Sequence, residues 1–141
     1  MKKHAGFLLI TSLFLLLLSC QSKSPESPEP LWIFRADLPL LFLQNIDEER
    51  LGVKSADAFF ILDKASGEVL HRYAPPGFGV AGALLEGNRL YYGGSDYYFR
   101  CTDVLKQKEL WKIRTRSINE EAPLLDERSV YWGSGDSTVY A

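Results

Sequence analysis

The stretch Arg89-Leu90-Tyr91-Tyr92-Gly93-Gly94-Ser95-Asp96 decides the fold, because related copies lie 39 to 40 residues away on either side. The earlier copy is Arg50-Leu51-Gly52-Val53-Lys54-Ser55-Ala56-Asp57, and the later one is Ser129-Val130-Tyr131-Trp132-Gly133-Ser134-Gly135-Asp136. Short apolar and aromatic runs punctuated by Gly, Ser and Asp, at a period near forty, are typical of the four-stranded blade of a β-propeller. The sequence therefore predicts an all-β fold built from repeated blades.

Each repeat divides into strands, because apolar and polar residues alternate between clusters of turn residues. The predicted strands are, in chain order, 38–46, 51–55, 59–63, 68–73, 83–86, 89–93, 97–103, 109–113, 122–125, 130–133 and one that begins at 138. These strands make an incomplete propeller of about three four-stranded blades over residues 31–141. The blades lie near 38–74, 82–114 and 121–141, and the last of them is incomplete.

Leu31-Trp32-Ile33-Phe34 lies 39 residues before Leu70-His71-Arg72-Tyr73, and this spacing predicts a fourth strand with no blade ahead of it. In propellers that close by strand exchange, such a strand completes the last blade. A closed ring needs at least about four blades, so the sequence is expected to be the N-terminal portion of a longer propeller. The alternative is a small open β-protein that finds a partner. In isolation, the exposed last blade is expected to cause poor solubility or oligomerisation.

The N-terminal 19 residues have the layout of a secretory signal-peptide helix. Lys2 and Lys3 precede an apolar run over 5–18, whose fourteen residues are too few to span a bilayer comfortably. The run ends in Leu17-Leu18-Ser19-Cys20, which resembles the lipobox of bacterial lipoproteins. The resemblance implies cleavage between Ser19 and Cys20 and lipidation of the Cys20 thiol, which would anchor the chain to a membrane. The alternative is an ordinary secreted protein with a chance cysteine at the cleavage site.

Residues 20–30 follow as a tether rich in Pro, Ser and Glu, with no apolar run to bury. With Cys20 lipidated, Cys101 is the remaining thiol, and it is predicted to be a buried apolar residue. The full chain carries 16 Lys and Arg against 18 Asp and Glu, a formal charge of -2, and has no basic stripe. Nothing in this charge pattern suggests a nucleic-acid partner.

The segment from Ile61 to His71 resembles the tryptophan-docking motif of quinoprotein-type propellers. That motif places Asp, Thr-Gly and Trp where this chain has Asp63, Ser66-Gly67 and His71. A second copy keeps Asp103 and Trp111 but has Lys106-Gln107 at the Thr-Gly place. Trp32 holds the equivalent Trp position ahead of the first blade. A Trp at the end of a fourth strand can pack across the gap to the next blade.

Together with the lipobox and the tether, this motif resembles the lipidated propellers with PQQ-like repeats typified by the BamB outer-membrane assembly lipoproteins. The resemblance implies a non-enzymatic scaffold without a cofactor, whose propeller loops bind envelope proteins. It implies lipid anchorage in the bacterial cell envelope, at the outer membrane and facing the periplasm. Two alternatives remain: the N-terminal part of a PQQ-dependent quinoprotein dehydrogenase, and a ligand-sensing propeller.

Asp57, Asp96 and Asp136 recur at one position of the repeat. A ring of carboxylates could bind a cation, but Asp also caps tight turns by accepting hydrogen bonds from nearby backbone N–H groups, and turn capping is the favoured interpretation. No catalytic or metal-ligating set is predicted. His4 lies in the signal, and His71 has neither a nucleophile partner nor a ligand at metal-binding spacing.

Overall fold

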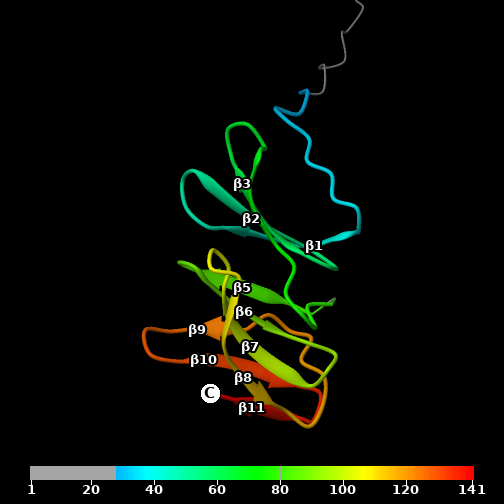
Figure 1. The fold of residues 1–141 in the computed structure, drawn as a ribbon, viewed down its shortest axis with the longest axis vertical. Helices are drawn as coiled ribbons and strands as arrows, with labels where there is room; N and C mark the ends of the chain where they lie inside the picture. The colour runs from blue at the N-terminus through cyan, green and yellow to red at the C-terminus, as the bar shows by residue number, and fades with distance from the viewer. Residues whose placement is uncertain (1–27, 80) are drawn as a thin grey trace, which may run out of the picture.

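The computed structural model describes residues 28–79 and 81–141 and contains no helix within these ranges. The predicted signal-peptide helix, Ser19 and Cys20 lie outside the described residues. Eleven strands follow one another along the chain (Figure 1). They are β1 (Leu40–Asn45), β2 (Arg50–Ser55), β3 (Phe59–Asp63), β4 (Val69–Tyr73), β5 (Ala83–Glu86), β6 (Arg89–Gly93), β7 (Tyr98–Asp103), β8 (Lys108–Arg114), β9 (Leu124–Leu125), β10 (Val130–Ser134) and β11 (Thr138–Tyr140).

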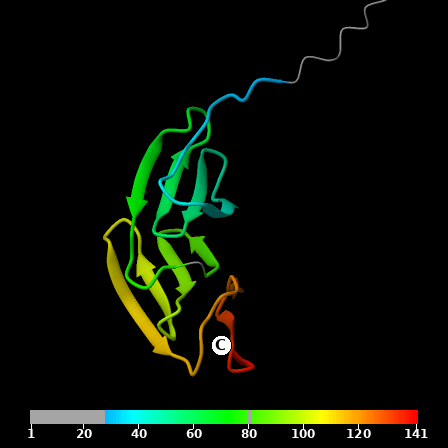
Figure 2. The ribbon, with the colours of Figure 1, turned by 90° about the vertical axis from the view of Figure 1, so that its right-hand side faces the viewer.

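The strands form three antiparallel sheets, one for each sequence repeat. The first sheet has the order β1-β2-β3-β4, the second β5-β6-β7-β8, and the third β11-β10-β9. The sheets lie in a row and do not close into a ring (Figure 2). The predicted all-β arrangement of about three blades, the last of them incomplete, is therefore confirmed.

Most predicted strand limits differ from the observed ones by one or two residues, and two of these differences have a clear structural reason. The seventh strand begins at Tyr98 and not at 97, because Tyr97 adopts a φ of 67°, in the left-handed region that does not continue a strand. The ninth strand is reduced to Leu124–Leu125, which pair with Val130 and Tyr131. The chain ahead of β9 instead runs against the second sheet, where Gly82 N donates to the Glu120 carbonyl at 2.6 Å.

The prediction of a fourth strand at Leu31-Trp32-Ile33-Phe34 is wrong for the described chain. This segment is extended but pairs with no strand, and exposed and half-buried residues alternate along 31–36. The half-buried Trp32, Phe34 and Ala36 pack against Val53, Phe60 and Leu62 of the first sheet. The fourth strand of a blade forms its hydrogen bonds with the third strand of the same blade. Segment 31–36 has no such neighbour, because it lies at the far end of the row from the incomplete third sheet (Figure 1).

The core consists of the interfaces between the sheets. Phe59 and Ile61 of the first sheet pack against Leu90 and Tyr92 of the second, with Phe78 of the connecting segment between the sheets. Tyr91 and Phe99 project from the opposite face of the second sheet and pack against Trp132 of the third. The alternation of neighbouring residues Tyr91 and Tyr92 therefore supplies two different interfaces, as expected when both faces of a strand are covered.

Candidate interaction surfaces

Trp32, His71 and Trp111 hold the same place in successive repeats, and the structure shows two of them docked on the following sheet. Trp32 Nε1 donates to the Lys64 carbonyl at 2.8 Å, and His71 Nε2 lies 2.6 Å from the Val104 carbonyl. Lys64 and Val104 are themselves equivalent, since each directly follows the Asp that ends the third strand of its sheet. The histidine therefore serves the same linkage as the tryptophan at the preceding junction.

The two turns that accept these rings are each organised by an aspartate, Asp63 in the first sheet and Asp103 in the second. Asp63 Oδ1 accepts the backbone N–H groups of Ala65 and Ser66 at 3.0 and 2.8 Å. Asp103 Oδ1 accepts those of Leu105 and Lys106 at 3.1 and 2.9 Å. The hydrogen bonds that Asp63 accepts lower its pKa, with the Ser66 backbone N–H as the largest cause, so the Asp63 carboxylate stays charged.

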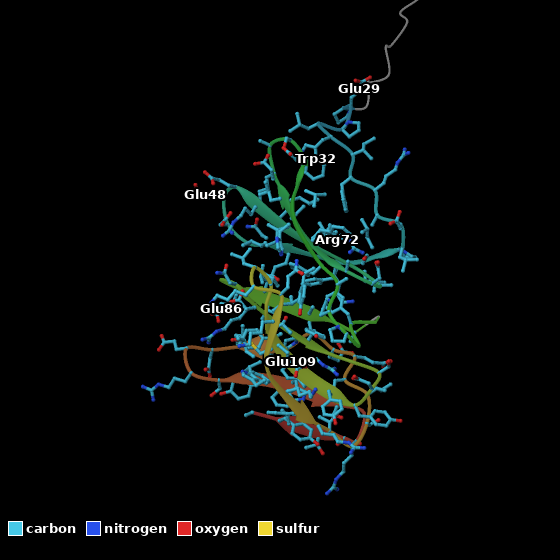
Figure 3. The ribbon with its side chains drawn as sticks, viewed as in Figure 1. Glu29, Trp32, Glu48, Arg72, Glu86 and Glu109 are labelled. Carbon is cyan, nitrogen blue, oxygen red and sulfur yellow. The ribbon has the colours of Figure 1, made fainter. Side chains whose placement is uncertain are left out.

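The glycine of the same turn is needed for its conformation and for space. Gly67 has a φ of 73°, and an added Cβ would lie 2.6 Å from ring atoms of Trp32, which Figure 3 shows beside this turn. In the second copy Gln107 occupies this position with a φ of 52°. The turn thus keeps its left-handed residue although the glycine has been replaced, at the conformational cost of a side chain in that region.

The three recurring aspartates do not behave alike. Asp96 Oδ1 accepts the Tyr98 N–H at 3.3 Å, and Asp136 Oδ1 accepts the Thr138 N–H at 3.1 Å, which is the turn capping predicted for them. Asp57 differs, because its Oδ1 accepts the Ser55 hydroxyl at 2.6 Å and its Oδ2 accepts Arg72 Nη2 at 3.0 Å. The Ser55 hydroxyl, which accepts the Ala58 N–H at 3.1 Å, caps the first turn.

Sequence reasoning missed one polar side chain that joins two sheets and one that forms a buried ion pair within the second repeat. Gln44 on β1 donates to the Leu85 carbonyl at 2.6 Å and accepts the Leu85 N–H at 2.8 Å, which joins the innermost strands of the first two sheets. Arg100 is nearly buried and pairs with Asp96 through two nitrogens, one of them at 2.9 Å. Neither residue recurs at its position in the other repeats, so the periodicity contained no signal for them.

Lys54 is fully buried at the junction of the first two sheets. Its ammonium donates to the carbonyls of Ser55 and Gly79 at 3.2 and 2.5 Å and lies 4.2 Å from the centre of the Phe78 ring. Burial lowers the pKa of Lys54 to about 8, against a smaller opposite effect of the Asp57 charge. The charged amine therefore holds the connecting segment in place but has lost its hydration.

This burial predicts a stability that rises with pH. Between pH 8 and the unfolded-state value of 10.5, the folded protein binds fewer protons at Lys54 than the unfolded chain, so raising the pH favours folding. The unfolding free energy of the wild type, relative to that of Lys54→Met, should increase by about 2 kcal/mol from pH 7 to 9.5. Urea titrations at both pH values measure it, and a constant difference would contradict the assignment.

A groove of about 230 Å³ lies between the second and third sheets at their β5–β6 and β9–β10 turns. Trp111 and Tyr91, with ring centres 6.1 Å apart, contribute its aromatic wall, and Arg89, Glu86 and Asp126 line its mouth. Glu86, which lines this groove, lies at the edge of the molecule (Figure 3). Backbone N–H groups, that of Arg128 foremost, keep the pKa of Asp126 low, so the groove presents charges of both signs beside an aromatic surface.

The remaining features concern the thiol of Cys101, metal ligands and membrane-spanning helices. Cys101 is buried, as predicted, and burial raises the pKa of its thiol. No three His, Cys, Asp or Glu side chains converge as a metal-binding set within the described residues. In the part of the chain that the structure describes, no helix is long and apolar enough to cross a bilayer.

No protein-family model and no curated protein matches this sequence. Solved structures resemble the fold at low sequence identity. BamB from Moraxella catarrhalis aligns with a TM-score of 0.55 and 21% identity, over 77% of this chain and 35% of BamB. The computationally designed protein Ika4 aligns with a TM-score of 0.52 and 13% identity, over 80% of this chain and 96% of Ika4.

A quinohemoprotein alcohol dehydrogenase, ADHIIG from Pseudomonas putida HK5, aligns with a TM-score of 0.51 and 16% identity, over 62% of this chain and 15% of the enzyme. The chain thus spans about a third of BamB and a smaller share of the dehydrogenase. The structural similarity establishes the propeller fold. Because the sequence identities are this low, the activity has to be argued from the surfaces of this chain.

Proposed function

We propose that this protein is a lipid-anchored, non-enzymatic scaffold of the bacterial cell envelope that binds other proteins, in outer-membrane protein assembly. The observation that carries the proposal is the BamB-like stacking of the three sheets in a chain whose N-terminus contains Leu17-Leu18-Ser19-Cys20. In this scheme residues 1–19 are the signal, Cys20 is the lipidated residue, and 20–30 are the tether.

The tether would give the folded part room to meet partners. A Pro-rich stretch of eleven residues extends about 3.1 Å per residue, so it reaches roughly 30 Å from the lipid surface. One acyl chain binds a membrane only marginally, whereas two or more give stable anchoring. A multiply acylated Cys20 would therefore hold the propeller at the outer membrane, on its periplasmic side, without a spanning helix.

The groove between the second and third sheets is the surface best suited to a protein partner. Trp111 remains partly exposed there, and aromatic residues are over-represented among the residues that dominate binding energy. Arg89 and Arg128 stand beside Glu86 and Asp126, so a peptide with charges of both signs could be oriented in the groove. An aromatic or aliphatic side chain of the partner would cover the Trp111 ring.

Anchoring is tested by labelling cells that express the full chain with an alkyne-bearing fatty acid. We expect label on the wild type and on Cys101→Ser, and recovery of both in the outer-membrane fraction. Cys20→Ser should lose the label and appear in the soluble periplasm. Label on Cys20→Ser, or equal membrane recovery of the two serine variants, would refute the anchor.

Partner binding is tested with a photo-crosslinking amino acid placed in the full-length protein. At the Arg128 position, in the groove, we expect cross-links to a protein of the outer-membrane assembly machinery, and Trp111→Ala should remove most of them. The control probe at Leu105, an exposed turn residue outside the groove, should not give these products. Equal products from both probes would show that the groove is not the binding site.

The fold similarity to ADHIIG supports one second candidate, the N-terminal part of a quinoprotein dehydrogenase. The described residues assemble no set of three acidic, His or Cys side chains for a divalent cation, so we derive no step through a quinone. The discriminating measurement is a titration of the full chain with PQQ and Ca²⁺, followed by quinone absorbance. Saturable binding would favour this second function over the scaffold.

A further inference from the structure

The outer strand of the second sheet, β8, has one open edge. It pairs with β7 along its other edge, and it runs with β4 along one side of the row of sheets (Figure 2). Outside the sheet, no hydrogen bond between main-chain groups of the described residues involves 108–114. An open edge directs alternate N–H and C=O groups outward, where another strand can pair with them. The second sheet has all four of its strands, so this edge does not result from the incomplete third sheet.

The open edge of β8 is also strongly basic. Residues 106–116 contain five Lys and Arg residues and one Glu, whereas the whole chain has a formal charge of -2. The expectation that the chain has no basic stripe therefore does not hold for this strand. Arg114 is exposed and belongs to no ion pair among the described residues. The Lys112 side chain is 47% exposed and contacts Glu109 at 3.2 Å.

Lys112 and Arg114 project from the side of β8 that faces the first sheet. Lys112 pairs with Arg100 on β7, and Arg100 pairs with Tyr92, which packs against the first sheet. Because the first sheet is complete, the exposure of these two cations does not depend on the third sheet. The bulge in β8 lies at Leu110, so the stretch 111–114 that carries both cations pairs regularly with β7.

The outer strand of the first sheet, β4, lacks this free positive charge. Arg72 on β4 is the equivalent of Lys112, and it contacts Asp57 at 3.0 Å. In the second sheet the equivalent aspartate, Asp96, pairs instead with the nearly buried Arg100. The two repeats therefore differ in their charges at the outer edge, and β8 alone of the two strands combines an open main chain with unneutralised cations.

We propose that the open edge of β8 binds an extended acidic segment of another protein, which adds to the second sheet as a further strand. Main-chain groups of the partner would pair with those of 111–114. Side chains two positions apart share a face of a strand, so acidic residues at alternate positions of the partner would lie opposite Lys112 and Arg114. Neither cation lines the groove between the second and third sheets, so this surface is distinct from it and does not require the lipid anchor.

The same charges disfavour other occupants of the edge. Pairing of two β8 edges would bring the cations of one copy beside those of the other, and like charges opposite one another on paired strands are destabilising. Lysine on an edge strand is a common protection against such self-association. An anionic lipid surface would neutralise the cations but would leave the main-chain groups of 111–114 without strand partners. An acidic peptide strand satisfies both.

Fluorescence anisotropy of a labelled peptide, added to the full chain in detergent micelles, tests the proposal. The probe is a short peptide in which Glu alternates with Val, and we expect saturable binding. A peptide of the same sequence with alternate main-chain nitrogens methylated keeps the charges but loses donors, so it should bind at least about tenfold more weakly. Equal binding of the two peptides would show charge attraction without strand pairing and would overturn the proposal.

A charge reversal in the protein tests the acidic specificity. Arg114→Glu should weaken binding of the Glu-Val peptide by about tenfold or more, and Arg114→Lys should keep most of it. The matched control is Arg35→Glu, the same substitution at an exposed residue beside the first sheet, which should change the affinity by less than about twofold. Equal effects of the two Glu variants would refute the site. Displacement of the peptide by phosphatidylglycerol added to the micelles would assign the edge to lipid and would also refute it.

Hydrogen exchange locates the bound peptide on the full chain. Amides of 111–114 that point away from β7 should exchange rapidly in the free protein and become protected when the peptide is added. Those of β4 and of the groove turn 126–129 should not change. Protection confined to 126–129 would place the peptide in the groove, which would refute this inference and leave the proposed scaffold function intact. Protection at 111–114 would support it even if the groove yielded no cross-links.

Discussion

A Gly93→Ala variant should lose about 3 kcal/mol of folding free energy, because the added methyl group has no room beside the segment that leads to the third sheet. A Cβ at Gly93 would overlap the carbonyl oxygen and Cβ of Asn119 and lie 2.9 Å from its carbonyl carbon. Asn119 is buried in the segment that connects the second and third sheets. Backbone cannot move aside as a flexible side chain can, so the third sheet must separate from the second.

The repeat itself supplies the control, because Gly133 occupies the same position in the third sheet. No atom lies within 4 Å of the place of its Cβ, so Gly133→Ala should change the folding free energy by less than about 0.5 kcal/mol. Urea unfolding compares the two variants. Equal stability of Gly93→Ala and Gly133→Ala would show that the contact with Asn119 does not hold the sheets together.

Trp132→Ala should destabilise the protein by about 3 to 5 kcal/mol, because it removes the largest side chain between the second and third sheets. The Trp132 ring is 3% exposed and stacks between Phe99, with ring centres 4.2 Å apart, and Tyr140, at 5.2 Å. Trp132 is the buried side chain of β10, and it packs in one cluster with Tyr91 and Phe99 of the second sheet. Loss of near-ultraviolet circular dichroism at lower urea concentrations than in the wild type would report it.

Trp132→Phe separates the ring stack from the indole N–H. Nε1 of Trp132 is buried without a hydrogen-bond partner in the described structure, and an unsatisfied buried donor costs about 1 to 3 kcal/mol. Phenylalanine keeps the stack and removes this donor, so its net cost should be only about 1 kcal/mol. If Trp132→Phe were as unstable as Trp132→Ala, the indole N–H would have to be satisfied in the folded protein.

The strands could be predicted because their signal is local. Ala83–Glu86 and Arg89–Gly93 were predicted to the residue, since Gly87 and Asn88 form a turn between two alternating runs. The start of β7 was missed by one residue, because nothing in the sequence shows that Tyr97 takes a positive φ. Local pattern thus defines strands well and their ends less well.

The sequence predicted where the docking residues lie in the repeat, but not which groups they bind. The spacing places Trp32 and His71 in one series, and the carbonyls of Lys64 and Val104 that accept them became apparent only in the fold. The buried amine of Lys54 had no signal at all, because a lysine in a strand is ordinarily exposed and one of its two carbonyl partners, Gly79, lies 25 residues away.

The sequence by itself determined the unit: a blade of about forty residues, its strands, its turn residues and the number of copies. Periodicity is a local property, and each unit follows the same rules of alternation and turn formation. Only the tertiary structure decided how the units meet. It decided that Gly93 lies against backbone, that Lys54 is buried, and that residues 31–36 pack on the first sheet without pairing to a strand. Those outcomes depend on contacts between residues distant in sequence, which no local pattern encodes.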